Sequence, residues 1–260
     1  MLLAIDIGNT TAAIGIFEGK KLLKEWRIRS VREKTADEYG ITLLELLRTS
    51  GLEPSAIKGA IISSVVPPLT PAFQTLSQKL FGVKALVVGP GLKTGMPILY
   101  ENPGEVGADR VVASVGAFEK YGGPCIVVEF GTATTFDAVT AKGEYLGGAI
   151  APGIQISAEA LYLRTAKLPR IEVAKPKKPI GKTTVASMQS GIYFGYIGLV
   201  NNIIAEISKE IGTPTKVVVT GGFASQLGPE IHVPHYHEPH LVLEGLRLLF
   251  DRNTEDKPSA

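Results

Sequence analysis

The stretch Asp6-Ile-Gly-Asn-Thr-Thr11 lies between two apolar runs, residues 2–5 and residues 12–17. A similar stretch, Glu129-Phe-Gly-Thr-Ala-Thr-Thr135, follows the apolar run that begins at Cys125. Each stretch has an acid, a glycine two positions later, and then small residues rich in hydroxyl groups. Residue 129 lies 123 positions after residue 6, which is close to half of the 260-residue chain. An internal duplication explains this spacing economically, so we expect two similar halves.

Apolar periodicity and turn residues predict alternating strands and helices around the first stretch. Three strands separated by polar turns are expected up to Ile28. A helix is expected over residues 35–50, because Thr35 and Glu38 form a capping box at its start. Similar runs predict further strands at 60–66, 85–88 and 125–128 and further helices at 69–81 and 111–121. This alternation predicts an α/β layered fold.

The composition and charge exclude several classes of protein. Hydrophobic residues make up 45% of the chain and charged residues 20%, which is typical of a folded protein and not of a disordered one. The 27 Lys and Arg residues nearly balance the 25 Asp and Glu residues, so neither a nucleic-acid partner nor an acidic membrane surface is expected. The single cysteine, Cys125, cannot form an internal disulfide, and its apolar strand predicts a buried small hydrophobe. A reducing cytoplasm is the expected compartment.

Two features bear on membrane association. The chain reaches Asp6 after only five residues, so no secretory signal peptide is expected. Residues 186–205 carry no charge and contain Gly191-Ile-Tyr-Phe-Gly195, a small-xxx-small pattern that also occurs in membrane helix dimers. Because the same segment contains Asn201 and Asn202, we favour a helix in a protein core or at a subunit interface over a membrane-spanning helix.

The two duplicated stretches carry the chemistry of a nucleotide site. A glycine after a strand leaves backbone N–H groups free to face an anion, and Gly8 and Gly131 allow close approach. Asp6 and Glu129 supply carboxylates where a cation that accompanies phosphate groups would lie. Donors to phosphate oxygens are available from Asn9, Thr10, Thr11, Thr132, Thr134 and Thr135. Either stretch alone could be a structural turn, but two that face each other would hold a nucleotide between two domains.

A third glycine site, Gly221-Gly222, follows the apolar run at residues 217–219. A glycine pair lets the backbone lie against a flat ring or a sugar, so a nucleoside pocket is one interpretation and a simple strand-to-helix turn is the other. The sequence Gly181-Lys-Thr183 would need glycine at position 176 to complete a Walker A loop, and that residue is Pro176. No G-x-G-x-x-G follows a strand, so the Rossmann dinucleotide interpretation is excluded.

The segment Gly104-Glu-Val-Gly-Ala-Asp-Arg110 precedes the helix expected at 111–121. Asp109 and Arg110 would lie in the first helical turn, where free N–H groups and the helix dipole attract anions and keep a carboxylate ionised. An ionised Asp109 could accept a proton from a substrate hydroxyl, while Arg110 could hold a carboxylate or phosphate. The alternative is structural, with Asp109 as a helix cap and Arg110 as its surface partner.

All four histidines lie within residues 232–240. His235 and His237 would share a face of an extended segment, as two zinc ligands can. Pro234 and Pro239 favour an exposed irregular loop instead, and no other part of the chain supplies companion ligands. A metal site is therefore not expected in this segment.

Further motifs accompany these stretches in a fixed order. They are Ser63-Ser-Val-Val-Pro-Pro68, Glu101-Asn-Pro-Gly-Glu-Val-Gly-Ala-Asp-Arg110, Gly131-Thr-Ala-Thr-Thr-Phe-Asp137, Gly147-Gly-Ala-Ile-Ala-Pro-Gly153 and Met188-Gln-Ser-Gly191. Together with residues 6–11, the set resembles type III pantothenate kinases over nearly the whole chain, up to about residue 250. Single motifs are shared with the acetate kinase, sugar kinase, Hsp70 and actin superfamily. The Gly-Ala-Asp-Arg segment, together with the others, is specific to this family.

The resemblance implies an α/β fold of two duplicated ribonuclease-H-like domains of the actin-like ATPase type, each with a mixed central sheet flanked by helices. The expected bounds are 1–118 and 119–251, with a mobile tail at 252–260. It implies a kinase that uses ATP to phosphorylate pantothenate to 4'-phosphopantothenate, the first step of coenzyme A biosynthesis. It also implies a cytoplasmic homodimer that needs Mg²⁺ with ATP and a monovalent cation, K⁺ or NH₄⁺.

The resemblance also implies roles for individual residues. Asp109 would accept the proton of the pantothenate hydroxyl, and Glu129 would contact the monovalent cation. ATP would be contacted by Asp6, Gly8, Asn9, Thr10, Thr11, Thr132, Gly221 and Gly222. The pantothenate pocket would be lined by Tyr100, Gly107, Ala108, Arg110 and Thr184. The family usually has aspartate at position 129, so the longer Glu129 could re-aim and still coordinate the cation, replace its role, or impair its binding.

Two other functions stay open at this point. One is a regulatory protein that resembles Bvg accessory factor, which shares the sequence pattern of this family. The other is a kinase of the same superfamily with another alcohol substrate. The presence of Asp6, Asp109, Arg110 and Thr132 argues against a non-catalytic role, because a binding protein has no need of a base.

Overall fold

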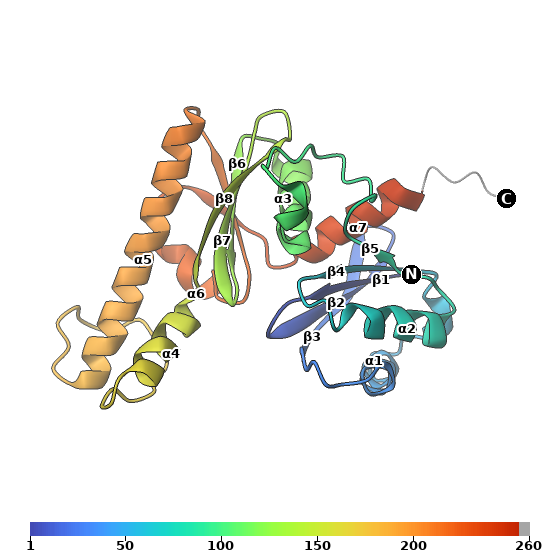
Figure 1. The fold of residues 1–260 in the computed structure, drawn as a ribbon, viewed down its shortest axis with the longest axis horizontal. Helices are drawn as coiled ribbons and strands as arrows, with labels where there is room; N and C mark the ends of the chain where they lie inside the picture. The colour runs from blue at the N-terminus through green and yellow to red at the C-terminus, as the bar shows by residue number, and fades with distance from the viewer. Residues whose placement is uncertain (255–260) are drawn as a thin grey trace. The chain divides into compact units, whose positions relative to one another are not determined.

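The computed structural model describes residues 1–254 of the 260-residue chain. These residues form two compact units. One contains residues 1–116 and 240–254, and the other contains Ala117–Pro239. Each unit has a sheet of its own with helices packed on it (Figure 1).

The last helix, α7 (Leu241–Thr254), belongs to the first unit although it follows the second unit in sequence. The predicted bounds 1–118 and 119–251 placed this segment with the second half. Of the tail predicted at 252–260, the first three residues form the end of α7, and residues 255–260 lie outside the described part of the chain.

The sheet of the first unit has five strands in the order β3-β2-β1-β4-β5. The first three strands form an antiparallel meander, while β4 runs parallel to β1 and β5 runs parallel to β4. Ile5, Ile14 and Ile62 point into one apolar core on the same face of this sheet. The strands are β1 (Leu2–Ile7), β2 (Thr11–Glu18), β3 (Lys21–Arg29), β4 (Gly59–Ser64) and β5 (Leu86–Val87).

The sheet of the second unit has the order β10-β9-β6-β7-β8. Its strands are β6 (Cys125–Phe130), β7 (Ala133–Val139), β8 (Tyr145–Pro152), β9 (Lys216–Thr220) and β10 (His235–His237). Here too an antiparallel meander of three strands is followed by two parallel strands. This match, strand for strand, confirms the predicted duplication and the predicted pair of ribonuclease-H-like α/β domains.

Helices cover both faces of the first sheet. α1 (Ala36–Thr49) and α2 (Thr70–Phe81) pack on the face that holds the apolar core, and α7 packs on the other face, where Leu243 lies against Gly15 (Figure 1). The Thr35 hydroxyl accepts the N–H of Glu38, and the Glu38 carboxylate accepts the N–H of Thr35. The predicted capping box at the start of α1 is therefore confirmed.

The helices of the second unit are α4 (Ile154–Arg164), α5 (Thr184–Ile211) and α6 (Ala224–Leu227), while α3 (Ala108–Tyr121) begins in the first unit and ends in the second. α5 buries Tyr193 and Tyr196 against the second sheet and turns Gly191, Gly195 and Gly198 outward, where an added Cβ would meet nothing within 4 Å. Within residues 1–254, no helix combines the length and the apolar character that crossing a membrane requires.

Candidate active site

The first glycine loop joins β1 to β2. Gly8 donates its N–H to the carbonyl oxygen of Thr11 at 3.1 Å, which closes the loop. A Cβ at Gly8 would lie 3.1 Å from that same oxygen, so glycine suits this tight reversal. Asn9, Thr10 and Thr11 are exposed at the tip. The loop therefore presents amide and hydroxyl groups to solvent, which an anion such as phosphate requires.

Asp6 is a half-buried residue that lies next to this loop, near the end of β1. Its Oδ1 atom is shielded from solvent and makes no hydrogen bond. The pKa of Asp6 is raised to about 7, first by burial and then by the negative charge of Asp109. Ser63, which pairs with Asp6 in register on β4, lowers this pKa, although its hydroxyl makes no hydrogen bond of normal geometry. A buried carboxyl oxygen without a partner is a position that a cation would stabilise.

Asp109 and Arg110 lie in the first turn of α3, where the sequence predicted them. Arg110 donates its backbone N–H to Asp109 Oδ1 at 2.8 Å. Burial raises the pKa of Asp109, and this hydrogen bond and the charge of Arg110 oppose the rise. The Arg110 residue is only 7% exposed, so the interpretation of Arg110 as a surface partner is wrong. Asp6 and Asp109 are thus two half-buried acids of the first unit, and the charge of Asp109 contributes to the raised pKa of Asp6.

Gly107 lies directly before this helical turn. A Cβ at this position would lie 2.6 Å from Asp109 Oδ1 and 3.6 Å from Val65 Cγ1. The absence of a side chain therefore leaves the space that the Asp109 carboxyl group occupies. Of the other residues expected around pantothenate, Tyr100 and Ala108 are half-buried in the same unit, and Thr184 is exposed at the start of α5 in the second unit.

The second glycine loop joins β6 to β7 and is one residue shorter than the first, because Glu129 pairs with Thr135 where Asp6 pairs with Ala13. Gly131 donates its N–H to the Ala133 carbonyl at 3.0 Å, and Thr132 is exposed. Glu129 is half-buried and pairs in register with Thr220 on its other side. Paired residues of neighbouring strands share a face, so the hydroxyl-bearing side chains of two strands, Thr135 on β7 and Thr220 on β9, flank Glu129.

A buried acid behind the second loop was not among the predicted site residues. Asp137 is fully buried and accepts hydrogen bonds from the Tyr145 hydroxyl at 2.7 Å and from the Thr135 hydroxyl at 3.1 Å. These bonds hold Thr135 in place beside Glu129. The only sequence signal was the position of Asp137 at the end of the motif that begins at Gly131, because burial is not visible in a single acidic residue.

The glycine pair after β9 has one structural and one open position. Gly221 has a φ of +95°, and a Cβ there would lie 2.5 Å from the Phe130 carbonyl oxygen. Glycine is therefore required at position 221, because the backbones of residues 221 and 130 approach each other closely. Gly222 has nothing within 4 Å of a Cβ position. The strand-to-helix interpretation thus explains Gly221, whereas Gly222 leaves the surface open for a ligand.

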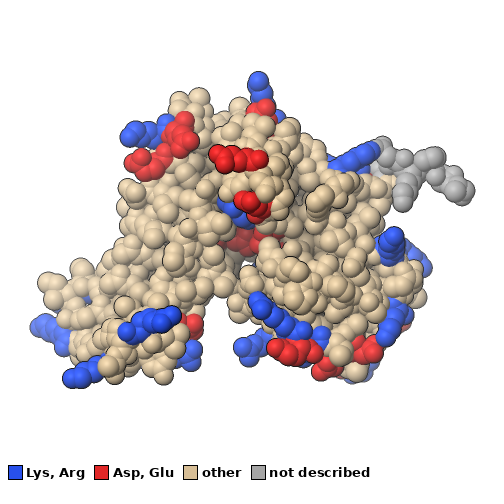
Figure 2. Space-filling model, viewed as in Figure 1, with Lys and Arg blue, Asp and Glu red and all other residues tan. Residues whose placement is uncertain are grey.

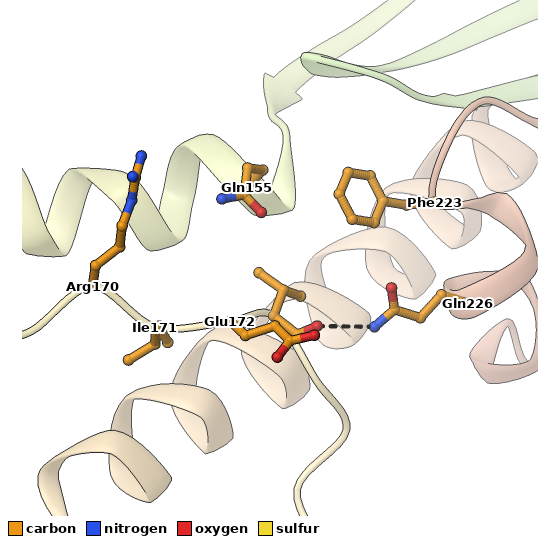
Figure 3. A pocket seen from close by; sticks show the side chains of 7 residues that line it. Gln155, Arg170, Ile171, Glu172, Phe223 and Gln226 are labelled. Carbon is orange, nitrogen blue, oxygen red and sulfur yellow. Dashed lines mark hydrogen bonds between the residues drawn. The ribbon is translucent and has the colours of Figure 1, made fainter. Parts of the chain in front are cut away.

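A pocket of about 520 Å³ lies beside this glycine pair, entirely within the second unit (Figure 3). Phe223 and Gln226 line one side, and Gln155 at the start of α4 lines another. Gln226 Nε2 donates to the Val173 carbonyl at 3.2 Å, which fixes the coil between α4 and α5 against α6. The rest of the lining comes from Arg170, Ile171, Glu172 and Val173. This pocket could not be predicted from the sequence, because three distant segments form it without a shared motif.

The histidine segment is more regular than predicted. His235–His237 forms β10, which pairs in parallel with β9, so the expectation of an irregular loop was wrong. The ladder with β9 supplies backbone partners between the flanking prolines. His240 Nδ1 lies 2.6 Å from Glu25 Oε2. In the part of the chain that the structure describes, no group of three or more His, Cys, Asp or Glu residues is arranged to hold a metal ion.

Comparison with known proteins shows what the chain is similar to. A sequence model of the type III pantothenate kinase family matches residues 2–206. The type III pantothenate kinase of Moorella thermoacetica is 55% identical over 254 residues, which cover 98% of this chain and all of that protein. A Baf family transcriptional activator from Campylobacter jejuni superposes with a TM-score of 0.59 at 17% identity, over 97% of this chain and 99% of that one. An inorganic polyphosphate/ATP-glucomannokinase from Arthrobacter sp. strain KM gives a TM-score of 0.53 at 15% identity, over 95% and 96% of the two chains. The two structural matches bear on the fold alone.

Proposed function

The chain belongs to the type III pantothenate kinase family, and from that premise we propose how its own residues carry the reaction. The enzyme transfers phosphate from ATP to the alcohol of pantothenate, giving 4'-phosphopantothenate in coenzyme A biosynthesis. Type III pantothenate kinases at 51–55% identity match nearly the whole length of this chain. This similarity disfavours both a regulatory protein like Bvg accessory factor and a kinase with another alcohol substrate. The observation that carries the assignment of roles is the hydrogen bond from the Arg110 N–H that holds Asp109 Oδ1 in the first turn of α3, in the same unit as the shielded and unpartnered Oδ1 of Asp6.

We assign the role of proton acceptor to Asp109. Its carboxyl group is held at the first turn of α3 by the Arg110 N–H, and burial raises its pKa, which makes it a stronger base. Phosphoryl transfer passes through a loose transition state in which the attacking alcohol loses its proton late. A carboxylate in a fixed position is therefore a sufficient base. Arg110, buried beside it, supplies positive charge for the pantothenate anion.

The phosphate groups of ATP are assigned to the glycine loops. In the first unit the contacts would come from Asp6, Gly8, Asn9, Thr10 and Thr11, and in the second from Thr132. The orphaned Oδ1 of Asp6 fits the Mg²⁺ that accompanies ATP, because a buried carboxylate oxygen is stabilised by a hard cation. When bound, Mg²⁺ neutralises charge on the phosphate oxygens. The loops position the phosphates through backbone N–H and hydroxyl groups.

The monovalent cation, K⁺ or NH₄⁺, is assigned to Glu129. The donor set fits a monovalent cation, since the carboxylate of Glu129 shares its face with the hydroxyl groups of Thr135 and Thr220. Of the three alternatives for glutamate at this position, this arrangement favours coordination. The Thr135 hydroxyl is in turn oriented by Asp137.

The nucleoside of ATP is assigned to the pocket beside Gly221-Gly222. The open surface at Gly222 and the ring of Phe223 suit a flat base, and the amides of Gln155 and Gln226 can pair with its polar edge (Figure 3). Around pantothenate we place Tyr100, Gly107, Ala108, Arg110 and Thr184.

We also propose that the enzyme is a cytoplasmic homodimer that associates through α5. Residues 183–205 carry no charge, and the outward face of the helix presents Gly191, Gly195 and Gly198 with the partly exposed ring of Phe194. Such a face allows close approach of a second helix.

A coupled ADP-release assay tests the function directly. Purified enzyme is assayed with Mg·ATP in the presence and absence of pantothenate, in K⁺ and then in Na⁺. The expected result is ADP release that depends on pantothenate and is faster in K⁺. Turnover that is indifferent to pantothenate would point to another substrate, and no turnover at all would return the regulatory alternative.

A further inference from the structure

One row of residues crosses the first sheet from its edge to Asp6. Arg27 on β3 pairs in register with Ala13 on β2, and Ala13 pairs with Asp6 on β1. Paired residues in neighbouring strands point to the same face of a sheet. The side chains of Arg27 and Asp6 therefore lie on one face, with only the methyl group of Ala13 between them. This face lies opposite the apolar core that contains Ile5 and Ile14.

The small residue in the middle of the row leaves a path for the arginine. Two strand spacings separate the backbones of Arg27 and Asp6, which is about 10 Å. The positive charge of Arg27 lowers the pKa of Asp6, so the two groups interact across Ala13. A larger side chain at position 13 would fill the space over which this interaction acts.

Arg27 has a partner that it can exchange. Its Nη2 lies 3.2 Å from Glu25 Oε1 on the same strand, and the side chain is 47% exposed. The Glu25 side chain is 19% exposed and also lies 2.6 Å from His240 Nδ1, so it keeps a second contact when Arg27 leaves. An ion pair with one exposed member contributes little to stability, on the order of 1 kcal/mol. The guanidinium group can therefore leave Glu25 for a stronger anion at little cost.

The chemistry of the reaction calls for a cation at this place. Neither glycine loop, residues 6–13 or residues 129–135, contains lysine or arginine. The triphosphate carries several negative charges, and kinases stabilise the transferred group with cationic side chains as well as with metal ions. Arg110 is already assigned to pantothenate, so the loop beside Asp6 still needs a protein cation.

We propose that Arg27 binds the phosphate groups of Mg·ATP above the Asp6 loop, in exchange for its contact with Glu25. A guanidinium group suits this role because it can donate two parallel hydrogen bonds to phosphate oxygens. The proposal deepens the proposed function and rests on it, because it requires that the loop at residues 6–11 holds phosphate.

The test compares variants of β3 in steady-state kinetics with Mg·ATP and pantothenate. Arg27→Gln is expected to lower kcat/KM for ATP about 10²-fold, as expected for loss of a donor to developing charge, with little change in KM for pantothenate. Arg27→Lys should lose less, because it keeps the charge but not the paired donors. The matched control is Lys24→Gln, which removes the same charge from the opposite face of the strand, where Lys24 pairs with Ile16. It should stay within about twofold of wild type.

Two further measurements show whether Arg27 contacts phosphate or only supports the fold, and whether a failure concerns Arg27 or the proposed function. Guanidinium ion at millimolar concentration should restore part of the activity of Arg27→Ala, which a purely structural role would not allow, and the melting temperature should be unchanged. Asp6→Asn serves as the test of the loop itself. If Asp6→Asn impairs the use of ATP while Arg27→Gln does not, the inference about Arg27 is overturned and the proposed function stands. If neither variant affects the use of ATP, the phosphate assignment of the loop is wrong as well.

Discussion

Replacing Gly107 by alanine should displace the carboxyl group of Asp109 while leaving the fold intact. The new Cβ would lie 2.6 Å from Asp109 Oδ1, whereas ordinary contact begins near 3.4 Å. The two atoms must therefore separate by about 0.8 Å, which breaks or lengthens the 2.8 Å hydrogen bond from the Arg110 N–H. A misplacement of about 1 Å can cost 10²-fold in rate, so we expect kcat to fall by about that factor, or about 2.7 kcal/mol.

The expected change in stability is small. Loss of one hydrogen bond costs about 1 kcal/mol, and the lower chain entropy of alanine offsets about 0.4–1 kcal/mol of it. The melting temperature of Gly107→Ala should therefore stay close to that of wild type. The matched control is Gly104→Ala in the same segment, where the new Cβ would meet Asn102 Oδ1 at an ordinary 3.5 Å.

The assay is steady-state turnover of pantothenate by Gly107→Ala, Asp109→Asn and the double variant. If Gly107 acts through Asp109, the double variant should be no slower than Asp109→Asn alone. Losses that multiply in the double variant, or a Gly107→Ala enzyme with wild-type kcat, would refute the reasoning.

Three other perturbations follow from the same site. Because Asp6 keeps its proton in the folded protein up to about pH 7 but loses it near pH 4 when unfolded, its contribution to stability falls as the pH rises from 4 to 7 and is absent above that range. In urea denaturation, the free energy of unfolding of Asp6→Asn minus that of wild type should therefore be larger at pH 8 than at pH 4.5. An equal value at both pH values would be inconsistent with the raised pKa of Asp6. Gly221→Ala should be destabilised by about 2 kcal/mol or more, because φ at residue 221 is positive and the new Cβ meets the Phe130 carbonyl. Gly222→Ala should keep the wild-type melting temperature and raise the KM for ATP. Equal stability of the two variants would contradict the geometry described for this turn. Glu129→Gln should lose the activation by K⁺ over Na⁺ while retaining its rate in Na⁺, and an unchanged ratio of the two rates would remove Glu129 from the cation site.

Local signals in the sequence predicted the parts of this protein that depend on neighbouring residues. The capping box at Thr35 placed the start of α1 correctly, and the two acid–glycine stretches located both strand-to-strand loops. Asp109 and Arg110 lie in the first turn of α3 because helix-start chemistry is encoded within a few residues. The two sheets share one strand order, β3-β2-β1-β4-β5 and β8-β7-β6-β9-β10, as the predicted duplication requires, although the order itself was not predicted.

Features that depend on tertiary register were not predictable in this way. The row from Arg27 to Asp6 exists only because β3, β2 and β1 pair with one particular alignment. The pocket at Phe223 requires a coil between α4 and α5 to fold against α6. The burial of Asp137 and the pairing of His235–His237 with β9 likewise come from packing between segments that are distant in sequence.

The central claim is that Asp109 takes the proton of the pantothenate hydroxyl. The measurement that tests it most directly is the rate of 4'-phosphopantothenate formation by Asp109→Asn in a single turnover, with Mg·ATP binding measured by calorimetry on the same sample. We predict a rate lower by about 10²–10⁴-fold with an unchanged dissociation constant for Mg·ATP. A rate close to that of wild type would contradict the claim.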